Sequence, residues 1–312
     1  MTVTLRPTDW RDLRVIHKNR SKGLYLDTAR VLTRGSSFAS GVVRSIFLSA
    51  TGAFTWVCTD ECEQPVLGQF AHIPKEPFAR LVLLAPDEAL ESEITVDLLE
   101  GLARQAGEHG AFHLLAEIPE DSSAFESLRK AGFVVYARQR IWKLQENGEG
   151  YKVAIPWVTA AKDKINAAQS LYHNLVPGLV QQIEPLPSRN VGGLVCHDDG
   201  ELLGYVDLQS GPRGIWAQPF IHPDTIEVDR RLRDMFDCIP NRRSRSVYLC
   251  VRSYQSWLES ALNKMEARPG PQQAVMVKHL AAKHTVLRPF TLPQLDGQHE
   301  ISSPVAHSHQ NS

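Results

Sequence analysis

The hydrophobic residues of the chain alternate between strand-like runs and helix-like stripes. Three apolar runs between residues 54 and 86, FTWVC, PVLGQFAHI and FARLVLLAP, have the length and composition of β-strands. Between Ile94 and Ala106, apolar residues recur at four-residue steps with charged residues on the other side, which predicts an amphipathic helix. AFHLLAEI and FVVYARQRIWKL then predict two more strands, separated by a short helix that ends at Gly132.

The second half of the chain repeats this order of elements. Near the N-terminus, VTLRP predicts a short strand, and DWRDLRVIHKNR and FASGVVRSIFLSA predict two helices. After residue 160, the pattern predicts helices broken at Pro177, a hairpin turning at Asp199 and Gly200, a strand, an amphipathic helix, the strand SVYLCV, a helix and a last strand. Repetition of one order of elements indicates two related α/β domains in tandem.

The segment KLQENGEGYK, residues 143–152, interrupts the apolar pattern with glycines and polar residues, as a linker does. We therefore predict an N-terminal domain over residues 1–146 and a C-terminal domain over residues 147–288. The final stretch is rich in proline and serine, which predicts a disordered tail over residues 289–312.

Charge and cysteine content narrow the class of partners. Thirty-four basic and 35 acidic residues give a formal net charge of −1, so no overall field attracts a polyanion or an anionic membrane. The N-terminus lacks the apolar core of a signal peptide, and no apolar run reaches the roughly 18 residues of a membrane helix. Among five cysteines only Cys58 and Cys62 are close in sequence, which indicates reduced thiols and no metal site. These features predict a cytoplasmic protein without a membrane partner.

The most distinctive segment runs from Ile94 to Arg138: a helix, a buried strand, a capped short helix ending in AGF, and a strand. Asp121 or Ser122 is the expected cap of the short helix. This segment resembles the core of the GNAT superfamily, the Gcn5-related N-acetyltransferases. The resemblance covers the first half and, by repetition, most of the second. It implies two tandem GNAT-like folds of the α/β class, each a mixed, mostly antiparallel sheet flanked by helices.

The resemblance also implies where acyl-CoA would bind. In the family a splayed pair of central strands holds acyl-CoA, and a loop of the form Gln/Arg-x-x-Gly-x-Gly binds the pyrophosphate at a helix N-terminus, where backbone N–H groups are free. Placed on this chain, the cofactor positions are Leu83, Leu84 and Ala85 on the strand and Leu90, Glu93 and Thr95 in the loop. The last three replace the basic residue and both glycines of the pattern.

The carboxylate of Glu93 would lie where the pyrophosphate binds, and two like charges about 4 Å apart cost on the order of 1 kcal/mol in water and more when partly buried. Alternatively, Glu91 and Glu93 only complement the positive end of their own helix. In the second domain the segment IHPDTIEV leaves no room for such a loop. There Asp224 or Thr225 is expected to cap the helix, and His222 is either a base or a turn residue.

Residues for acyl transfer are sparse. The tyrosine that in this family protonates the leaving thiolate falls at Leu128 in the first domain and at Ala261 or Leu262 in the second. Glu117, at the end of the strand HLLAE, is the candidate general base, with His113 on the same strand face. A solvated carboxylate is the alternative reading of Glu117.

The segment from Arg230 to Ser246 contains six arginines, of which Arg242, Arg243 and Arg245 are the candidates for contacting phosphate. The alternative is a solvated helix face followed by a basic turn. Because aromatic residues are sparse in this segment, we do not expect nucleic acid as a partner.

Two functions remain. The chain is either a CoA-dependent GNAT N-acyltransferase, which uses acetyl-CoA or another acyl-CoA to acylate a small-molecule or peptide amine, or a catalytically inactive GNAT fold that binds a ligand or a partner. The altered loop and the missing tyrosines favour the second. We predict a monomer or a homodimer, because two domains in one chain can take the place of the dimers that single-domain relatives form.

Overall fold

The computed structural model describes residues 3–19, 22–35, 52–60, 64–146, 148, 151–160, 165–186, 193–198 and 200–280. The predicted helix FASGVVRSIFLSA, Cys62 and the predicted tail over residues 289–312 all lie outside the described residues. The described part confirms the predicted class, since it combines helices with a large mixed sheet whose strands pair mostly antiparallel.

The first half of the chain supplies strands and helices close to those that the hydrophobic pattern predicts, and it adds a short strand and a helix between residues 24 and 34 that the pattern did not predict. They are β1 (Thr4–Pro7), η1 (Trp10–Asp12), α1 (Leu13–Lys18), β2 (Leu24–Tyr25), α2 (Thr28–Arg34), β3 (Ala53–Thr59), β4 (Val66–His72), β5 (Phe78–Ala85), η3 (Asp87–Ala89), α4 (Glu93–Glu108), β6 (His113–Pro119), α5 (Ala124–Lys130) and β7 (Val134–Lys143). The predicted cap of α5 is wrong. The helix begins after Ser123, and its start has no side-chain cap.

The second half follows the predicted order as well. Its elements are β8 (Val158–Thr159), α6 (Ile165–Leu175), α7 (Gly178–Ile183), β9 (Gly193–Asp198), β10 (Glu201–Ser210), β11 (Gly214–Ile221), α8 (Val228–Cys238), β12 (Ser246–Arg252), η5 (Ser253–Gln255), α9 (Leu258–Lys264) and β13 (Arg268–His279). The last strand begins earlier than its apolar run. The strand contains Pro269 and Pro271. Its register with β7 shifts between Pro269 and Gln272, so the N–H group that proline lacks does not break a regular series of hydrogen bonds.

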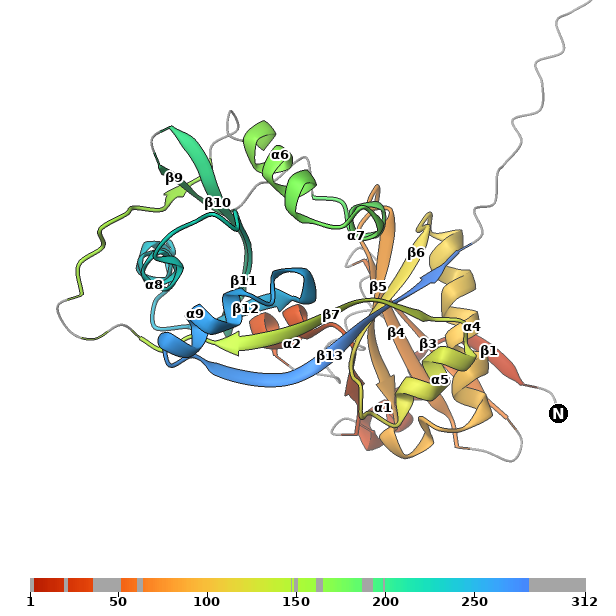
Figure 1. Cartoon of the computed structure of the whole chain (residues 1–312). Helices are drawn as coiled ribbons and strands as arrows, with labels where there is room; N and C mark the ends of the chain where they lie inside the picture. The colour runs from red at the N-terminus through yellow and green to blue at the C-terminus, as the bar shows by residue number, and fades with distance from the viewer. Residues whose placement is uncertain are drawn as a thin grey trace, which may run out of the picture. The chain divides into compact units, whose positions relative to one another are not determined.

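The described strands form one sheet in the order β1-β3-β4-β5-β6-β13-β7-β12-β11-β10-β9-β8, with β2 paired to β5. The long strands β7 and β13 lie side by side at its centre (Figure 1). β13 also pairs with β6 of the first half, and β7 pairs with β12 of the second. Each half therefore places its last strand inside the other half. The sheet continues past residue 146, and the limits 1–146 and 147–288 stay a prediction.

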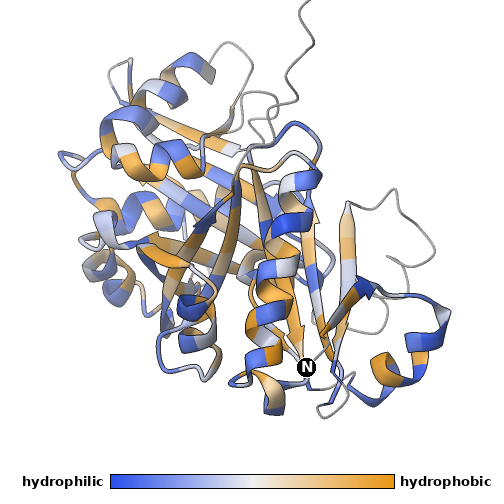
Figure 2. Ribbon diagram, turned by 90° about the vertical axis from the view of Figure 1, so that its right-hand side faces the viewer, coloured by the Kyte–Doolittle hydropathy of each residue, from blue (hydrophilic) through white to orange (hydrophobic). Residues whose placement is uncertain are grey.

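Helix α4 illustrates how the sequence pattern produces the packing. Its apolar stripe, which includes Leu98 and Leu102, is buried against β3 and β4. A Cβ atom at Gly68 of β4 would lie 2.5 Å from a methyl carbon of Leu102, so this close approach requires glycine. Figure 2 shows the same division across the molecule, with strands mainly hydrophobic and helices hydrophobic on one side only.

Candidate acyl-CoA site

The splay that the resemblance predicts is present between β5 and β6. These two strands pair in parallel at three positions, from Phe78 opposite His113 to Arg80 opposite Leu115. Beyond Arg80 they no longer pair with each other. We refer to the unpaired ends of β5 and β6 as the first splay.

The chain itself occupies the first splay. Leu24 and Tyr25 pair with β5 opposite Leu84 and Leu83, two of the predicted cofactor positions. The N–H of Leu26 donates to the carbonyl of Val82 on β5 at 3.0 Å, and its carbonyl accepts from the N–H of Glu117 on β6 at 2.9 Å. The Leu26 side chain is 1% exposed and belongs to the main core of the first half. The backbone of Leu26 therefore joins the two diverging strands where the family places acyl-CoA.

Glu117, the predicted base, is buried at 3% exposure and is engaged on both carboxylate oxygens. Oε2 accepts from the N–H of Thr28, the first residue of α2, at 3.0 Å, and Oε1 lies 3.4 Å from Nη1 of Arg80. Burial raises the pKa of Glu117, although the charge of Arg80 opposes that change. In this position Glu117 anchors the start of α2. His113 is turned toward β13 instead, with its Nδ1 3.2 Å from Nδ1 of His279.

A buried ion cluster that the sequence did not indicate lies beside Glu117. Glu184, which follows α7, binds Nη2 of Arg80 through Oε1 at 2.7 Å and Nη2 of Arg252 through Oε2 at 2.8 Å. Burial alone would raise the pKa of Glu184, but the two guanidinium groups outweigh it and lower that pKa to about 2. In the sequence, Glu184 is a single charge after an apolar helix, a common pattern that carries no signal for such a cluster.

The loop after β5 forms no phosphate cradle. Leu90 is buried, and its carbonyl accepts from Oγ of Ser127 at 2.5 Å. Thr95 is buried and donates through Oγ1 to the carbonyl of Ala89 at 2.7 Å. Only Glu93 is exposed, at 78% of its side chain, where it pairs with Lys130 at 3.0 Å. The predicted cofactor positions of the loop are thus occupied by packing and by hydrogen bonds within the protein.

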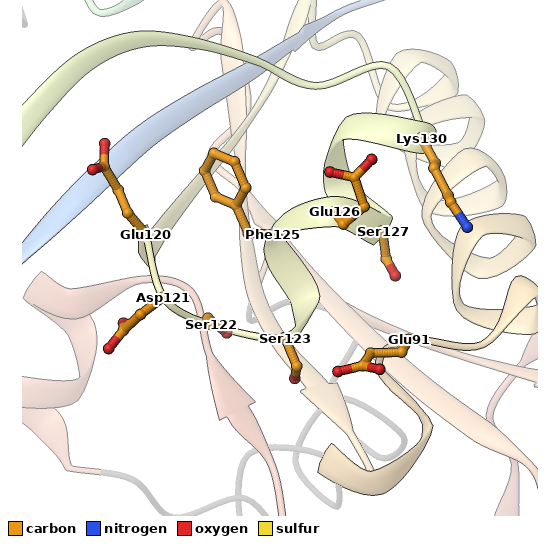
Figure 3. A pocket seen from close by; sticks show the side chains of 9 residues that line it. All are labelled: Glu91, Glu120, Asp121, Ser122, Ser123, Phe125, Glu126, Ser127 and Lys130. Atoms are coloured by element: carbon orange, nitrogen blue, oxygen red, sulfur yellow. The ribbon is translucent and has the colours of Figure 1, made fainter.

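A hollow of about 420 Å³ lies beside this loop, at the start of α5. Figure 3 shows carboxylates around it. Its lining residues are Glu91, Glu120, Asp121, Ser122, Ser123, Phe125, Glu126, Ser127 and Lys130. Four carboxylates against one ammonium group make this surface unfavourable for the phosphates of CoA.

The second half contains a corresponding splay, which we call the second splay. Strands β11 and β12 pair in parallel from Gly214 to Ala217 on β11, and their ends then separate. Gln255 of η5, which is 3% exposed, binds the unpaired end of β11. Its Nε2 donates to the carbonyl of Pro219 at 2.8 Å, and its Oε1 accepts from the N–H of Ile221 at 3.2 Å. The side-chain amide of Gln255 therefore forms hydrogen bonds with the backbone groups that a neighbouring strand or a ligand would otherwise bind.

The helix that follows the second splay lacks a phosphate loop too. Its N-cap is Glu227, in the left-handed region at φ 51°, so the predicted cap by Asp224 or Thr225 is wrong. The Nδ1 of His222 accepts from the N–H of Asp224 at 3.3 Å, which gives His222 a role in the turn.

The positions at which the family has the tyrosine that protonates the thiolate lie in the hydrophobic core in both halves. Leu128 and Leu262 are fully buried, and Ala261 is 6% exposed. Their apolar side chains cannot protonate a leaving group.

The arginines of the basic turn are largely used by the protein itself. Arg242 stacks over Phe236 at 4.5 Å and pairs with Glu146 at 3.0 Å. Arg245 donates to the carbonyl of Gly211 at 2.8 Å. Of the three predicted phosphate contacts, only Arg243 has neither an ion pair nor a hydrogen bond from its side chain within the part of the chain described here.

Among the described residues, no three His, Cys, Asp or Glu side chains lie close enough together to hold a metal ion. Cys58, Cys196 and Cys250 are buried free thiols. No helix within the described ranges is both long enough and apolar enough to cross a membrane.

Comparison with known proteins agrees with this architecture. No protein-family model matches the sequence, and no curated protein matches it. A GCN5-related N-acetyltransferase from Sphaerobacter thermophilus matches the structure with a TM-score of 0.55 at 11% identity, over 89% of this chain and 95% of that chain. A tandem GNAT protein from the clavulanic acid biosynthesis pathway matches with a TM-score of 0.49 at 14% identity, over 89% of this chain and 98% of that one. The match to the Sphaerobacter thermophilus structure shows that the chain has the fold of the GNAT N-acetyltransferases.

Proposed function

We propose that this protein is a catalytically inactive member of the GNAT fold, which binds a ligand or a partner and transfers no acyl group. The observation that carries the proposal is the insertion of Leu26 into the first splay, where its backbone bonds to both β5 and β6. Acyl-CoA could bind there only after this segment had left. The bonds of Gln255 in the second splay support the same conclusion for the other half.

The cost of opening the first splay follows from the contacts that would be lost. Two backbone hydrogen bonds of Leu26 contribute about 1 kcal/mol each, and the charged bond from Thr28 to Glu117 about 2 kcal/mol. Exposing the Leu26 side chain costs about 2 kcal/mol more. Together these contacts oppose acyl-CoA by about 6 kcal/mol, which corresponds to an affinity roughly 10⁴-fold weaker.

The test is a calorimetric titration of the full chain with acetyl-CoA, together with an assay for CoA release in the presence of small-molecule and peptide amines. We expect neither heat nor release at about 1 mM acetyl-CoA, since a micromolar site weakened by the factor above would bind only at much higher concentration. Micromolar binding by the unmodified protein would contradict the proposal, and CoA release would restore the acyltransferase as its function.

A pair of variants separates the altered loop from the closed splay. The variant Leu90→Arg, Glu93→Gly, Thr95→Gly restores the family's loop, and we expect it still to bind no acetyl-CoA because Leu26 continues to occupy the splay. Adding Leu26→Gly to that variant weakens the inserted segment and should produce measurable binding. Far-ultraviolet circular dichroism verifies that each variant is folded. Recovery of micromolar binding by the loop changes alone would refute the role given to Leu26.

A further inference from the structure

Two histidines face each other across the exchanged strand. His113 begins β6 and His279 ends β13, and the two residues are directly opposite in the antiparallel register. Their Nδ1 atoms are 3.2 Å apart, and their rings meet at 85° with centroids separated by 5.0 Å. His279 is exposed and His113 is half-buried. The two nitrogens therefore face each other at a point that solvent can reach.

This spacing is compatible with a metal ion bound between the two nitrogens. Bonds of about 2.0–2.1 Å to a tetrahedral Zn²⁺ place two imidazole nitrogens roughly 3.3 Å apart. An imidazole whose ring nitrogen is free of a proton can offer that nitrogen's lone pair to such an ion. The exposed side leaves room for water as the remaining ligands. The other arrangement that fits the distance is a single hydrogen bond between the two rings.

We propose that His113 and His279 form a binding site for one divalent transition-metal ion of the Zn²⁺, Ni²⁺ or Cu²⁺ type, with water completing its coordination. Opposite positions on two neighbouring strands fix the two ligands in place, so little side-chain freedom is lost on binding. Since β13 belongs to the second half of the chain and β6 to the first, the ion would fasten the exchanged strand to its neighbour. Its effect is to stabilise the folded sheet, and it does not depend on the proposed function.

The experiment uses the full chain in a background that removes other histidines capable of binding metal near the C-terminus. In this background His284, His299, His307 and His309 are replaced by serine. We expect titration with Cu²⁺ or Ni²⁺ to show one equivalent bound, with Cu²⁺ binding more tightly than Ni²⁺. Pulsed electron paramagnetic resonance of the Cu²⁺ form should report two coordinated imidazoles.

Single substitutions then test the two ligands. His113→Asn and His279→Asn should each lower the imidazole count to one and weaken binding by at least tenfold, while His173→Asn, at an exposed histidine of α6, should change nothing. At a tenfold excess of metal over the dissociation constant, the melting temperature of the background protein should rise by roughly 3–5 °C. Binding that survives both single substitutions, or no binding at millimolar metal, would overturn the proposal.

Discussion

Glu184 offers the sharpest test of the buried ion cluster. In the substitution Glu184→Gln, the shape of the side chain is kept but its charge is lost. Arg252, which is 3% exposed, then loses its ion-pair partner, and Arg80 keeps only the longer contact with Glu117. An unpaired buried charge is costly because neither water nor a counter-ion compensates it, and breaking such a pair costs about 3–5 kcal/mol.

The pKa of Glu184 gives a second value for the folding free energy that Glu184→Gln would lose. A fall from the ordinary 4.5 to about 2 corresponds to about 3 kcal/mol of folding free energy at neutral pH. Because the pKa is depressed in the folded protein, this contribution is complete above pH 4.5 and is lost as the pH falls toward 2. By this relation, a little under half of this contribution should remain at pH 3. Glu117, whose pKa is raised by burial, acts in the opposite direction and stabilises the fold as it becomes protonated.

The assay is urea unfolding of the wild type and of Glu184→Gln, followed by tryptophan fluorescence at pH 7 and pH 3. We expect the variant to lose about 3 kcal/mol at pH 7 and about half of that at pH 3. The matched control is Glu259→Gln, which removes a partly exposed ion pair with Arg140 of 2.9 Å and should cost less than about 1 kcal/mol. Equal losses in the two variants, or a loss that does not change with pH, would refute the account of the cluster.

Two further predictions concern the core. Burial raises the pKa of the Cys58 thiol to about 11 and that of the Cys250 thiol to about 12. Both thiols should therefore resist a thiol reagent at pH 8 until the protein unfolds, whereas the half-buried Cys238 should react. Rapid labelling of Cys250 in the native protein, detected by mass spectrometry, would contradict this prediction. A Cβ at Gly193 would lie 2.2 Å from the carbonyl oxygen of Val206, so Gly193→Ala should lower the melting temperature by about 5 °C or more, and an unchanged value would show that β9 can shift.

Several elements could be predicted because their signals are local. The stripe of α4, the buried run of β6 and the turn signals around Gly132 depend only on neighbouring residues, and the structure places each where the pattern indicated. The placement of Leu90, Glu93 and Thr95 at the basic and glycine positions of the family's loop rests on the resemblance and stays a prediction. The caps were harder to predict, since polar residues compete for a helix start and the geometry of the preceding turn selects among them.

The sequence by itself determined the class of fold and the order of most elements, because hydrophobic periodicity acts over a few positions. Only the tertiary structure decided that Leu26 fills the first splay and that β13 crosses into the first half. It also brought Glu184 to Arg80, 104 positions away. Periodicity reports which face of a strand is buried, but not which distant segment covers it; that choice depends on packing and charge pairing across the whole sheet.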